Sequence, residues 1–333
     1  MRNLMKPLRA ALLVTVALAG AGCPKVPGGV PGAGGGCGEI KGIPMAAKLN
    51  AFLQASAELD SATAKLENSV KDACKKMAVE LKIPTAGDTA TLCNAVSAEL
   101  KESWKVSLKA KTKLNVKYTP AKCTVKADFA AEVAAKCEAK ATADMSVKCE
   151  GTCGGTCNGA CDGTCAGSAG TGGSGGQCNG QCQGQCNGSC SGGCEGHADV
   201  DASAECKASA NVRANLQAEC TKPDVDVEVD MGLVLDTSRF ERAKAAVKAG
   251  LGELLMAGEK AKGLVGAVKV WASAAKDLAA SGKDIAKGLG MKAACVAGQL
   301  SASARAAASI SVRVDVSVSA SASVGGAASG STN

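Results

Sequence analysis

The stretch CEGTCGGTCNGACDGTCAGSAGTGGSGGQCNGQCQGQCNGSCSGGC, residues 149–194, decides how the middle of the chain folds. It holds ten cysteines in two arms of five, and within each arm every cysteine is four residues from the next. The linker between the arms, residues 166–177, has the composition of a flexible loop. If the chain folds back there, each cysteine meets a partner and the two residue numbers sum to 343. The predicted pairs are Cys165–Cys178, Cys161–Cys182, Cys157–Cys186, Cys153–Cys190 and Cys149–Cys194.

The same sum continues outside the repeat. It pairs Cys137 with Cys206 and Cys123 with Cys220, and it also places Pro120 opposite Pro223. A constant sum is the register of an antiparallel hairpin, in which directly opposite residues come close enough for a disulfide. We therefore expect seven disulfides to join the two halves of one long hairpin.

Alternation of residue types distinguishes strand from helix in this hairpin. Odd positions are apolar from 123 to 149, and even positions are small or apolar from 196 to 220, which is the two-residue period of a strand. Within the repeat, Cys and Gly share one face and polar residues take the other. The alanine-rich segment 127–141 also has helical propensity, so a stapled helical hairpin is the alternative. The pattern favours strands.

The N-terminus has a basic segment, an apolar segment and then small residues before Cys23, which is the organisation of a secretory signal. Ala21, Gly22 and Cys23 resemble the lipobox of bacterial lipoprotein precursors, although Gly20 stands where leucine is usual. This resemblance covers the first 23 residues and implies lipidation of Cys23. Pro24 after that cysteine implies retention at the outer membrane. Simple cleavage after Ala17-Leu18-Ala19 is the alternative.

The number of cysteines agrees with a lipoprotein. There are 19, and using Cys23 for the lipid leaves an even number to pair. So many closely spaced thiols persist as disulfides only in an oxidising compartment. The formal charge is +7, of which three positive charges lie in the leader, and this excess is too small to indicate nucleic-acid binding.

Two further parts of the sequence predict helices. Residues 45–82 place apolar side chains on one stripe, interrupted by Ser56 and Thr63, and a second helix is expected over 88–104 with Asp88 as its cap. We expect Cys74 and Cys93 to join these helices. Residues 236–306 are also predicted to be helical, with breaks near Gly258 and Gly282.

Shorter alternating segments predict strands around the hairpin. Residues 105–118 and 224–231 are a basic and an acidic strand, and the sum of 343 places Lys117 opposite Asp226, Lys113 opposite Asp230 and Tyr118 opposite Val225. On both segments the apolar residues change from even to odd positions at the proline, Pro120 or Pro223. This change predicts a twist or paired bulge there. A last strand is expected over 310–324. The two remaining cysteines, Cys37 and Cys295, are expected to pair.

These elements predict an α+β fold, in which a helical base packs on a small antiparallel sheet and carries a very long disulfide-laddered β-hairpin. The expected organisation is a signal peptide (1–22), a Gly/Pro-rich tether after the lipidated cysteine (23–43), a discontinuous base (44–118 and 224–326), the hairpin (119–223) and a disordered tail (327–333).

Residues suited to catalysis are scarce. The single histidine, His197, is expected at an exposed strand position and cannot form a multi-histidine metal site. The carboxylates of residues 224–230 suit a solvated or salt-bridged face, and Trp104, Trp271, Phe52 and Phe240 suit a core. Cysteine spacing of four is permitted for zinc, but the nested symmetry favours disulfides. We therefore expect no enzyme activity, no metal and no cofactor.

Two functional classes follow. The first is a non-enzymatic envelope lipoprotein, periplasmic or surface-exposed, whose rigid ribbon acts in structure, adhesion or self-assembly with a protein partner or another copy. The second is an oligomeric pore or export component that uses the ribbon as barrel strands. Metal sequestration by the cysteines is a third possibility. Ice binding is a lesser one, because the repeat offers no regular threonine array.

Overall fold

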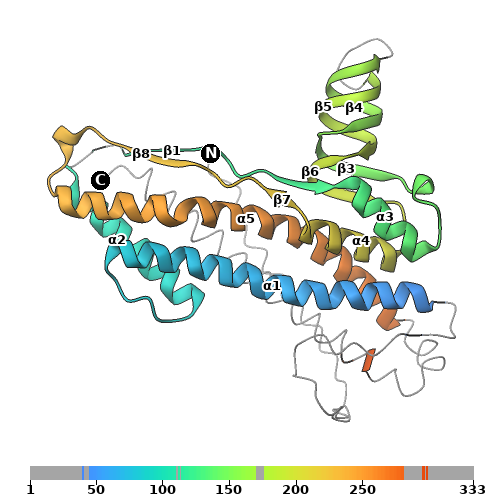
Figure 1. The fold of residues 1–333 in the computed structure, drawn as a ribbon, viewed down its shortest axis with the longest axis horizontal. Helices are drawn as coiled ribbons and strands as arrows, with labels where there is room; N and C mark the ends of the chain where they lie inside the picture. The colour runs from blue at the N-terminus through green and yellow to red at the C-terminus, as the bar shows by residue number, and fades with distance from the viewer. Residues whose placement is uncertain are drawn as a thin grey trace. The chain divides into compact units, whose positions relative to one another are not determined.

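The computed structural model describes residue 40, residues 45–109, 112, 114–169 and 176–280, and residues 295, 296 and 298. Within this part of the chain the fold is α+β, as predicted (Figure 1). The predictions on the leader, Cys23, Cys37, Lys113, Gly282, residues 310–324 and the tail fall outside the described residues, as does the predicted tether except for Ile40. Ile40 is buried in the core, and its backbone N–H and carbonyl both bond the Asn50 amide at 3.0 Å, so the prediction that the tether extends to residue 43 is wrong at this residue.

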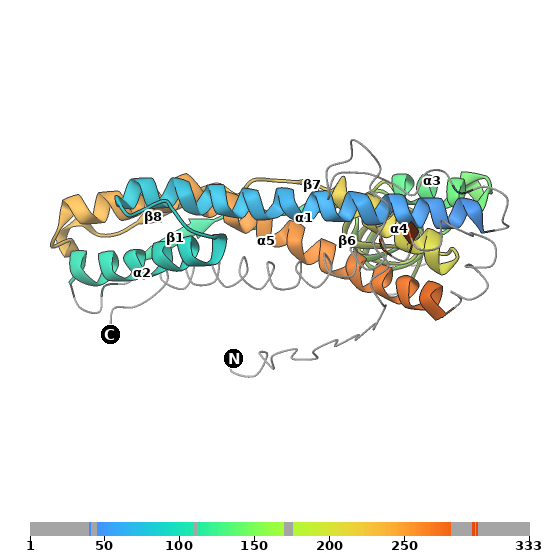
Figure 2. The same ribbon diagram turned by 90° about the horizontal axis from the view of Figure 1, so that it is seen from below.

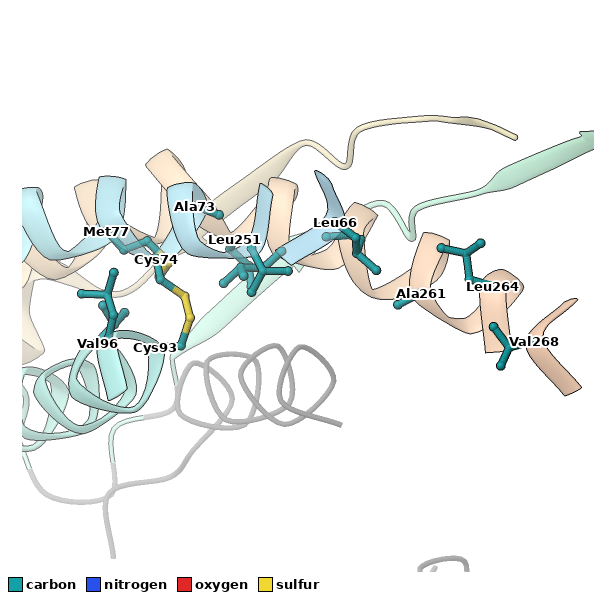
Figure 3. Close-up of a cluster of buried hydrophobic side chains, with 14 of the residues drawn as sticks. Leu66, Ala73, Cys74, Met77, Cys93, Val96, Leu251, Ala261, Leu264 and Val268 are labelled. Atoms are coloured by element: carbon teal, nitrogen blue, oxygen red, sulfur yellow. A yellow bond between two sulfur atoms is a disulfide. The ribbon is translucent and has the colours of Figure 1, made fainter. Parts of the chain in front are cut away.

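The first two helices form as the sequence predicts, except that the second continues to Ser107, into the predicted strand over 105–118. Helix α1 (Ala46–Leu81) ends at Lys82, which adopts the left-handed conformation, and α2 (Thr89–Ser107) begins after Asp88. The Asp88 carboxylate accepts a hydrogen bond from the Thr91 N–H at 2.7 Å, which satisfies a free donor of the first turn. The predicted disulfide Cys74–Cys93 joins the two helices, with Cα atoms 5.2 Å apart (Figure 3).

The long helix α5 (Thr237–Ala280) is continuous, so the predicted break near Gly258 is wrong. A glycine inside a helix costs about 1 kcal/mol relative to alanine. Burial of the apolar side chains on either side, among them Leu254, Ala257 and Ala261, offsets that cost.

Helices α1 and α5 lie side by side and form the main core (Figures 1 and 2). The rings of Phe52 and Trp271 stack with centroids 5.3 Å apart. The indole N–H of Trp271 donates to the Ser56 hydroxyl at 2.8 Å, and that hydroxyl donates to the Phe52 carbonyl. Ser56, which interrupts the apolar stripe in the sequence, is therefore a satisfied polar group inside the core.

A two-stranded sheet of β1 (Asn115–Tyr118) and β8 (Val225–Glu228) has the predicted register, with Lys117 opposite Asp226 and Tyr118 opposite Val225. The ion pairs nevertheless differ from a direct cross-strand pattern. The Lys117 ammonium contacts Glu228 at 2.7 Å, and Asp226 contacts Lys248 of α5 at 2.8 Å. The acidic strand is thus tied to the helix that it covers.

The register of 343 continues in β2 (Cys123–Lys126) and β7 (Glu219–Cys220), where Cys123 lies opposite Cys220. Between these strands and the β1–β8 pair, at Pro120 and Pro223, neither chain segment is in a strand. The structure therefore has a paired interruption where the sequence predicts a paired bulge.

The expectation of continuous strands over 123–149 and 196–220 is wrong. Residues Ala127–Glu138 form helix α3 and residues Ala204–Leu216 form helix α4. Alanine satisfies either period because it is small on every face, and its high helix propensity then decides. The predicted disulfide Cys137–Cys206 still forms, now between two helices, with Cα atoms 5.5 Å apart.

Beyond these helices lies the repeat. After the short helix η1 (Thr142–Asp144), strands β3 (Val147–Cys153) and β4 (Thr156–Ala169) carry the first cysteine arm, and β5 (Gly176–Ser191) and β6 (Gly193–Val200) carry the second. They belong to a six-stranded antiparallel sheet with the order β4-β5-β3-β6-β2-β7. A second short helix, η2 (Met231–Leu233), precedes α5.

Candidate functional site: the coiled ribbon

The ten cysteines of residues 149–194 form the five disulfides that the sequence predicts. Their Cα atoms are 5.7–6.1 Å apart, within the usual range for a disulfide. All ten side chains are at most 4% exposed except that of Cys165, which is partly exposed. These disulfides fill the interior of this region.

The strand register is not the one predicted. Cys157 lies opposite Cys190 and Cys161 lies opposite Cys186, so the numbers of directly opposite residues sum to 347. The bonded partner of Cys157 is Cys186, four residues away from its opposite residue. The expectation that bonded cysteines lie directly opposite one another is therefore wrong for this repeat.

The reason is that β4 and β5 wind around each other. Thr156 lies opposite Ser191 on one edge and opposite Gln181 on the other, and the same double pairing runs from residue 156 to residue 161. The two partners are ten residues apart, so about ten residues complete one turn. At ~3.3 Å per residue a turn is about 33 Å long, which corresponds to a coil about 10 Å across. We call the part of β3–β6 that holds the ten cysteines, the described residues of 149–194, the coiled ribbon; Figure 1 shows the winding of β4 and β5.

Coiling explains how the disulfides form. In a straight ribbon, Cys157 and Cys186 would be offset by four residues, or about 13 Å. In the coil, Cys157 pairs with Cys190 on one edge of β4 and with Gly180 on the other edge. Cys186 lies between these two residues along β5. The bond therefore crosses the interior of the turn, and the Cα–Cα distance is 5.8 Å.

Glycine makes this tight winding possible. A Cβ atom added to Gly155 would lie 1.7 Å from the Ser191 carbonyl oxygen, and one added to Gly184 would lie 2.1 Å from that of Asp162. No side chain fits at such distances from a neighbouring backbone. These glycines are on the predicted cysteine face, but alternation in the sequence gives no sign that they lie directly against the backbone of the opposite strand.

The outer face of the coiled ribbon is polar and nearly uncharged. The predicted separation of faces is confirmed: the cysteines point inward, and hydroxyl and amide side chains are exposed. Because strands pair on both edges, these exposed residues align in columns across neighbouring strands, such as Ser191, Thr156 and Gln181. The exposed polar residues are Thr152, Thr156, Asn158, Asp162, Thr164, Asn179, Gln181, Gln185 and Ser191.

The base of the ribbon is attached to helix α3. The Gly192 carbonyl accepts a hydrogen bond from the Ala127 N–H at 2.7 Å, and the Gly192 N–H donates to the Asp128 carboxylate at 3.1 Å. Asp128 lies in the first turn of α3, where a negative charge also favours the helix dipole. These contacts fix the direction in which the chain enters the coil.

Helices α3 and α4 are held to α1 by Glu138. Its carboxylate accepts a hydrogen bond from the Ser203 N–H at 2.7 Å and contacts the Lys48 ammonium at 3.1 Å. Partial burial acts to raise the pKa of Glu138, but the bonds from Ser203 and Lys48 prevail and lower it to about 2. The carboxylate is therefore charged throughout the physiological range.

The other sequence candidates form no catalytic arrangement in the described part of the chain. His197 lies opposite Glu150 in the β3–β6 register. Of the carboxylates in 224–230, Asp226 pairs with Lys248, and Asp230 accepts the Gly232 N–H. Trp104, Trp271, Phe52 and Phe240 are core residues, as predicted.

Metal-binding side chains do not cluster among the described residues, where no group of three or more His, Cys, Asp or Glu could hold an ion. Every cysteine described, including Cys295, is in a disulfide. A hollow of about 400 Å³ on the side of the ribbon is lined by Thr152, Cys153, Gly154, Gln181, Cys182 and Gly184, and this lining contains no ionisable group apart from the bonded cysteines.

Comparison with known families, with curated proteins and with solved structures gives no match. Among the helices described, none is long and apolar enough to cross a membrane.

Proposed function

We propose that this protein is a non-enzymatic lipoprotein of the cell envelope, anchored in the outer membrane through Cys23, whose coiled ribbon is a rigid structural or adhesive element. The observation that carries the proposal is the pairing of β4 and β5 with each other on both edges. Backbone pairing and five cross-links hold the ribbon in one shape, which suits a spacer or a contact surface.

The same observation weighs against a pore built from these strands. Strands that close a barrel between copies need free edges, and residues 156–161 of β4 already use both edges within one chain. The ribbon would have to uncoil and break its disulfides before it could join such a barrel. The polar outer face also offers little apolar area to lipid.

The proposal has two experimental tests. Cells that express the protein are fed an alkyne fatty acid, and we expect label on the wild type and none on Cys23→Ser. Detergent-purified protein is then examined by electron microscopy, where single particles or linear assemblies support the proposal and closed rings contradict it.

A matched pair of variants tests whether the ribbon is the contact surface. Asn158→Arg adds a charge to its exposed outer face, and Asn94→Arg makes the same change at an exposed position of α2. We expect the first to reduce cross-linking of the protein to its envelope partners or to other copies, and the second to leave it unchanged. Equal effects would mean that the ribbon is not the contact surface.

A further inference from the structure

The interior cysteines of the ribbon form one continuous series. Each bond joins residues whose numbers sum to 343, and each directly opposite pair sums to 347. A cysteine inside the series therefore has one partner to which it is bonded and another that lies opposite. From the end of the ribbon to its base, the five bonds are Cys165–Cys178, Cys161–Cys182, Cys157–Cys186, Cys153–Cys190 and Cys149–Cys194. Each bond is linked to the next by one directly opposite pair. These four pairs are Cys165 and Cys182, Cys161 and Cys186, Cys157 and Cys190, and Cys153 and Cys194.

We propose that the ribbon is a thiol relay, which moves a free thiol from Cys165 to Cys149 by successive thiol–disulfide exchange. The two pairing schemes differ only in which neighbour each sulfur bonds. Opposite residues of antiparallel strands have Cα atoms about 4.5–5.5 Å apart, which lies within the disulfide range of about 4.4–6.8 Å. Both schemes therefore fit the same backbone.

The relay begins with an external dithiol. It transfers two electrons and two protons to the Cys165–Cys178 bond, becomes a disulfide itself, and leaves two thiols on the protein. The Cys165 thiolate then attacks the Cys182 sulfur. A bond forms between these two cysteines, the Cys161–Cys182 bond breaks, and the Cys161 thiolate takes up the proton that Cys165 lost.

Each later step repeats this exchange without further electrons. Cys161 attacks Cys186 and releases Cys157; Cys157 attacks Cys190 and releases Cys153; Cys153 attacks Cys194 and releases Cys149. After four exchanges the protein has four disulfides in the repeat and thiols at Cys149 and Cys178. Cys178 takes no further part, because the residue opposite it in this register is Ala169.

Exposure identifies the starting point. Cys165 is the one cysteine of the ten that is partly exposed, and its bond to Cys178 is the last of the ladder, at the end farthest from Cys149. The strands extend to Ala169 and resume at Gly176, so the prediction of a loop over 166–177 is wrong at both ends. The other sulfurs lie on residues that are at most 4% exposed. A soluble dithiol therefore reaches the first bond, and the interior bonds change through their neighbours.

The attacking group is the thiolate, which an ordinary cysteine thiol forms in appreciable fraction at mildly alkaline pH. Residues 149–194 contain no lysine or arginine, and their only charged residues are Glu150 and Asp162. Lys148 precedes Cys149 and Lys126 lies opposite Gly193, so the nearest cations in sequence and register are at the base of the ribbon. The short distance within each pair offsets the small thiolate fraction.

The test uses the oxidised full-length protein and one equivalent of dithiothreitol at about pH 8.5. After several hours the reaction is quenched, free thiols are alkylated, and the alkylated and linked peptides are identified by mass spectrometry. The relay predicts label on Cys178 and label shared among the first-arm cysteines, with new Cys165–Cys182 and Cys153–Cys194 linkages. It predicts no label on Cys182, Cys186, Cys190 or Cys194.

Two wild-type outcomes overturn the proposal. Label confined to Cys165 and Cys178 shows that the thiol does not move. Equal label on both members of an interior pair, such as Cys161 and Cys182, shows direct reduction by the dithiol. Either pattern is read from the unmodified chain, so the test does not depend on a variant that folds.

A double variant locates the path. Cys157→Ser with Cys186→Ser removes one complete bond and the sulfur that Cys161 would attack. Label then reaches Cys161 but falls to background at Cys153 and Cys149. Label at Cys149 equal to that of the wild type would contradict an ordered relay.

Discussion

The helical base and the coiled ribbon of this protein are stabilised by different interiors. The base buries large side chains, including Phe52, Trp271 and Leu251, each at most 1% exposed. The buried cluster inside the ribbon consists of cysteines, with no larger apolar side chain among the residues whose burial is described. A coil too narrow for an apolar core can thus be stabilised by covalent bonds. The base gains stability by burying apolar surface, whereas disulfides stabilise the ribbon by restricting the conformations of the unfolded chain.

This difference predicts that the two regions fail under different conditions. A base held by apolar packing responds to denaturant and to truncation of core side chains. A ribbon held by disulfides responds to reductant and to any side chain that separates its opposite strands.

Full reduction is expected to unfold the ribbon and spare the helices of the base. Each disulfide typically contributes ~2–4 kcal/mol, and a glycine-rich two-stranded ribbon has little other stability. We expect residues 149–194 to become sensitive to protease while the helical circular dichroism signal persists. Parallel loss of that signal, or protection of the ribbon with all thiols free, would contradict the comparison.

Truncation of the central aromatic residue should affect the base most. Trp271→Ala removes a fully buried indole that stacks on Phe52, and such changes cost about 3–5 kcal/mol. Urea unfolding followed by circular dichroism measures the loss, with exposed Lys269→Ala as the control. The disulfide pattern of the ribbon should be unchanged, and a changed pattern would show that the regions are not independent.

Adjacent glycines provide the sharpest test of the ribbon. Gly155→Ala would place a Cβ atom 1.7 Å from the Ser191 carbonyl oxygen, whereas Gly154→Ala would place one 3.4 Å from that of Gly193. We expect the first to destabilise the ribbon by about 3 kcal/mol and the second by much less. The readout is the dithiothreitol concentration at which the ribbon disulfides open. Equal midpoints for the two variants would argue against close backbone contact between the opposite strands at Gly155.

The Glu138 contact is expected to give a smaller, pH-dependent effect. Its pKa is lowered from 4.5 to about 2, so its contribution is complete above pH 4.5 and is lost as the pH falls from 4.5 towards 2. We expect Glu138→Gln to cost about 2 kcal/mol at pH 7 and almost nothing near pH 2, allowing for solvent screening. Urea unfolding across this range measures it, with exposed Glu102→Gln as control. A pH-independent difference would mean that the charge is not responsible.

Much of the fold could be predicted from the sequence because its signals are long or exact. Helix α1 shows its stripe over ten turns, and the sum of 343 identifies partners such as Cys137–Cys206 and Cys123–Cys220. That sum does not specify secondary structure, since a pair of helices satisfies it as well as a pair of strands. In α3 the deciding factor is alanine, whose small side chain fits both periods.

The coil of the candidate site could not be predicted from the same signal. Periodicity describes one strand and its faces, whereas coiling depends on contact between turns that are ten residues apart. Gly184 lies against the backbone of the opposite strand, at Asp162 and Gly163, and a C-x-G-x repeat suits a flat ribbon equally well. Cysteine positions thus predict the bonds, but the path of the backbone between them depends on packing.

Hydrogen exchange of the backbone amides of residues 156–161, in the oxidised protein, tests the central claim most directly. If both edges of this strand are paired, as the coil requires, consecutive amides should all exchange slowly. A flat two-stranded ribbon leaves every second amide pointing to solvent, and an alternation of slow and fast exchange along these residues would contradict the account.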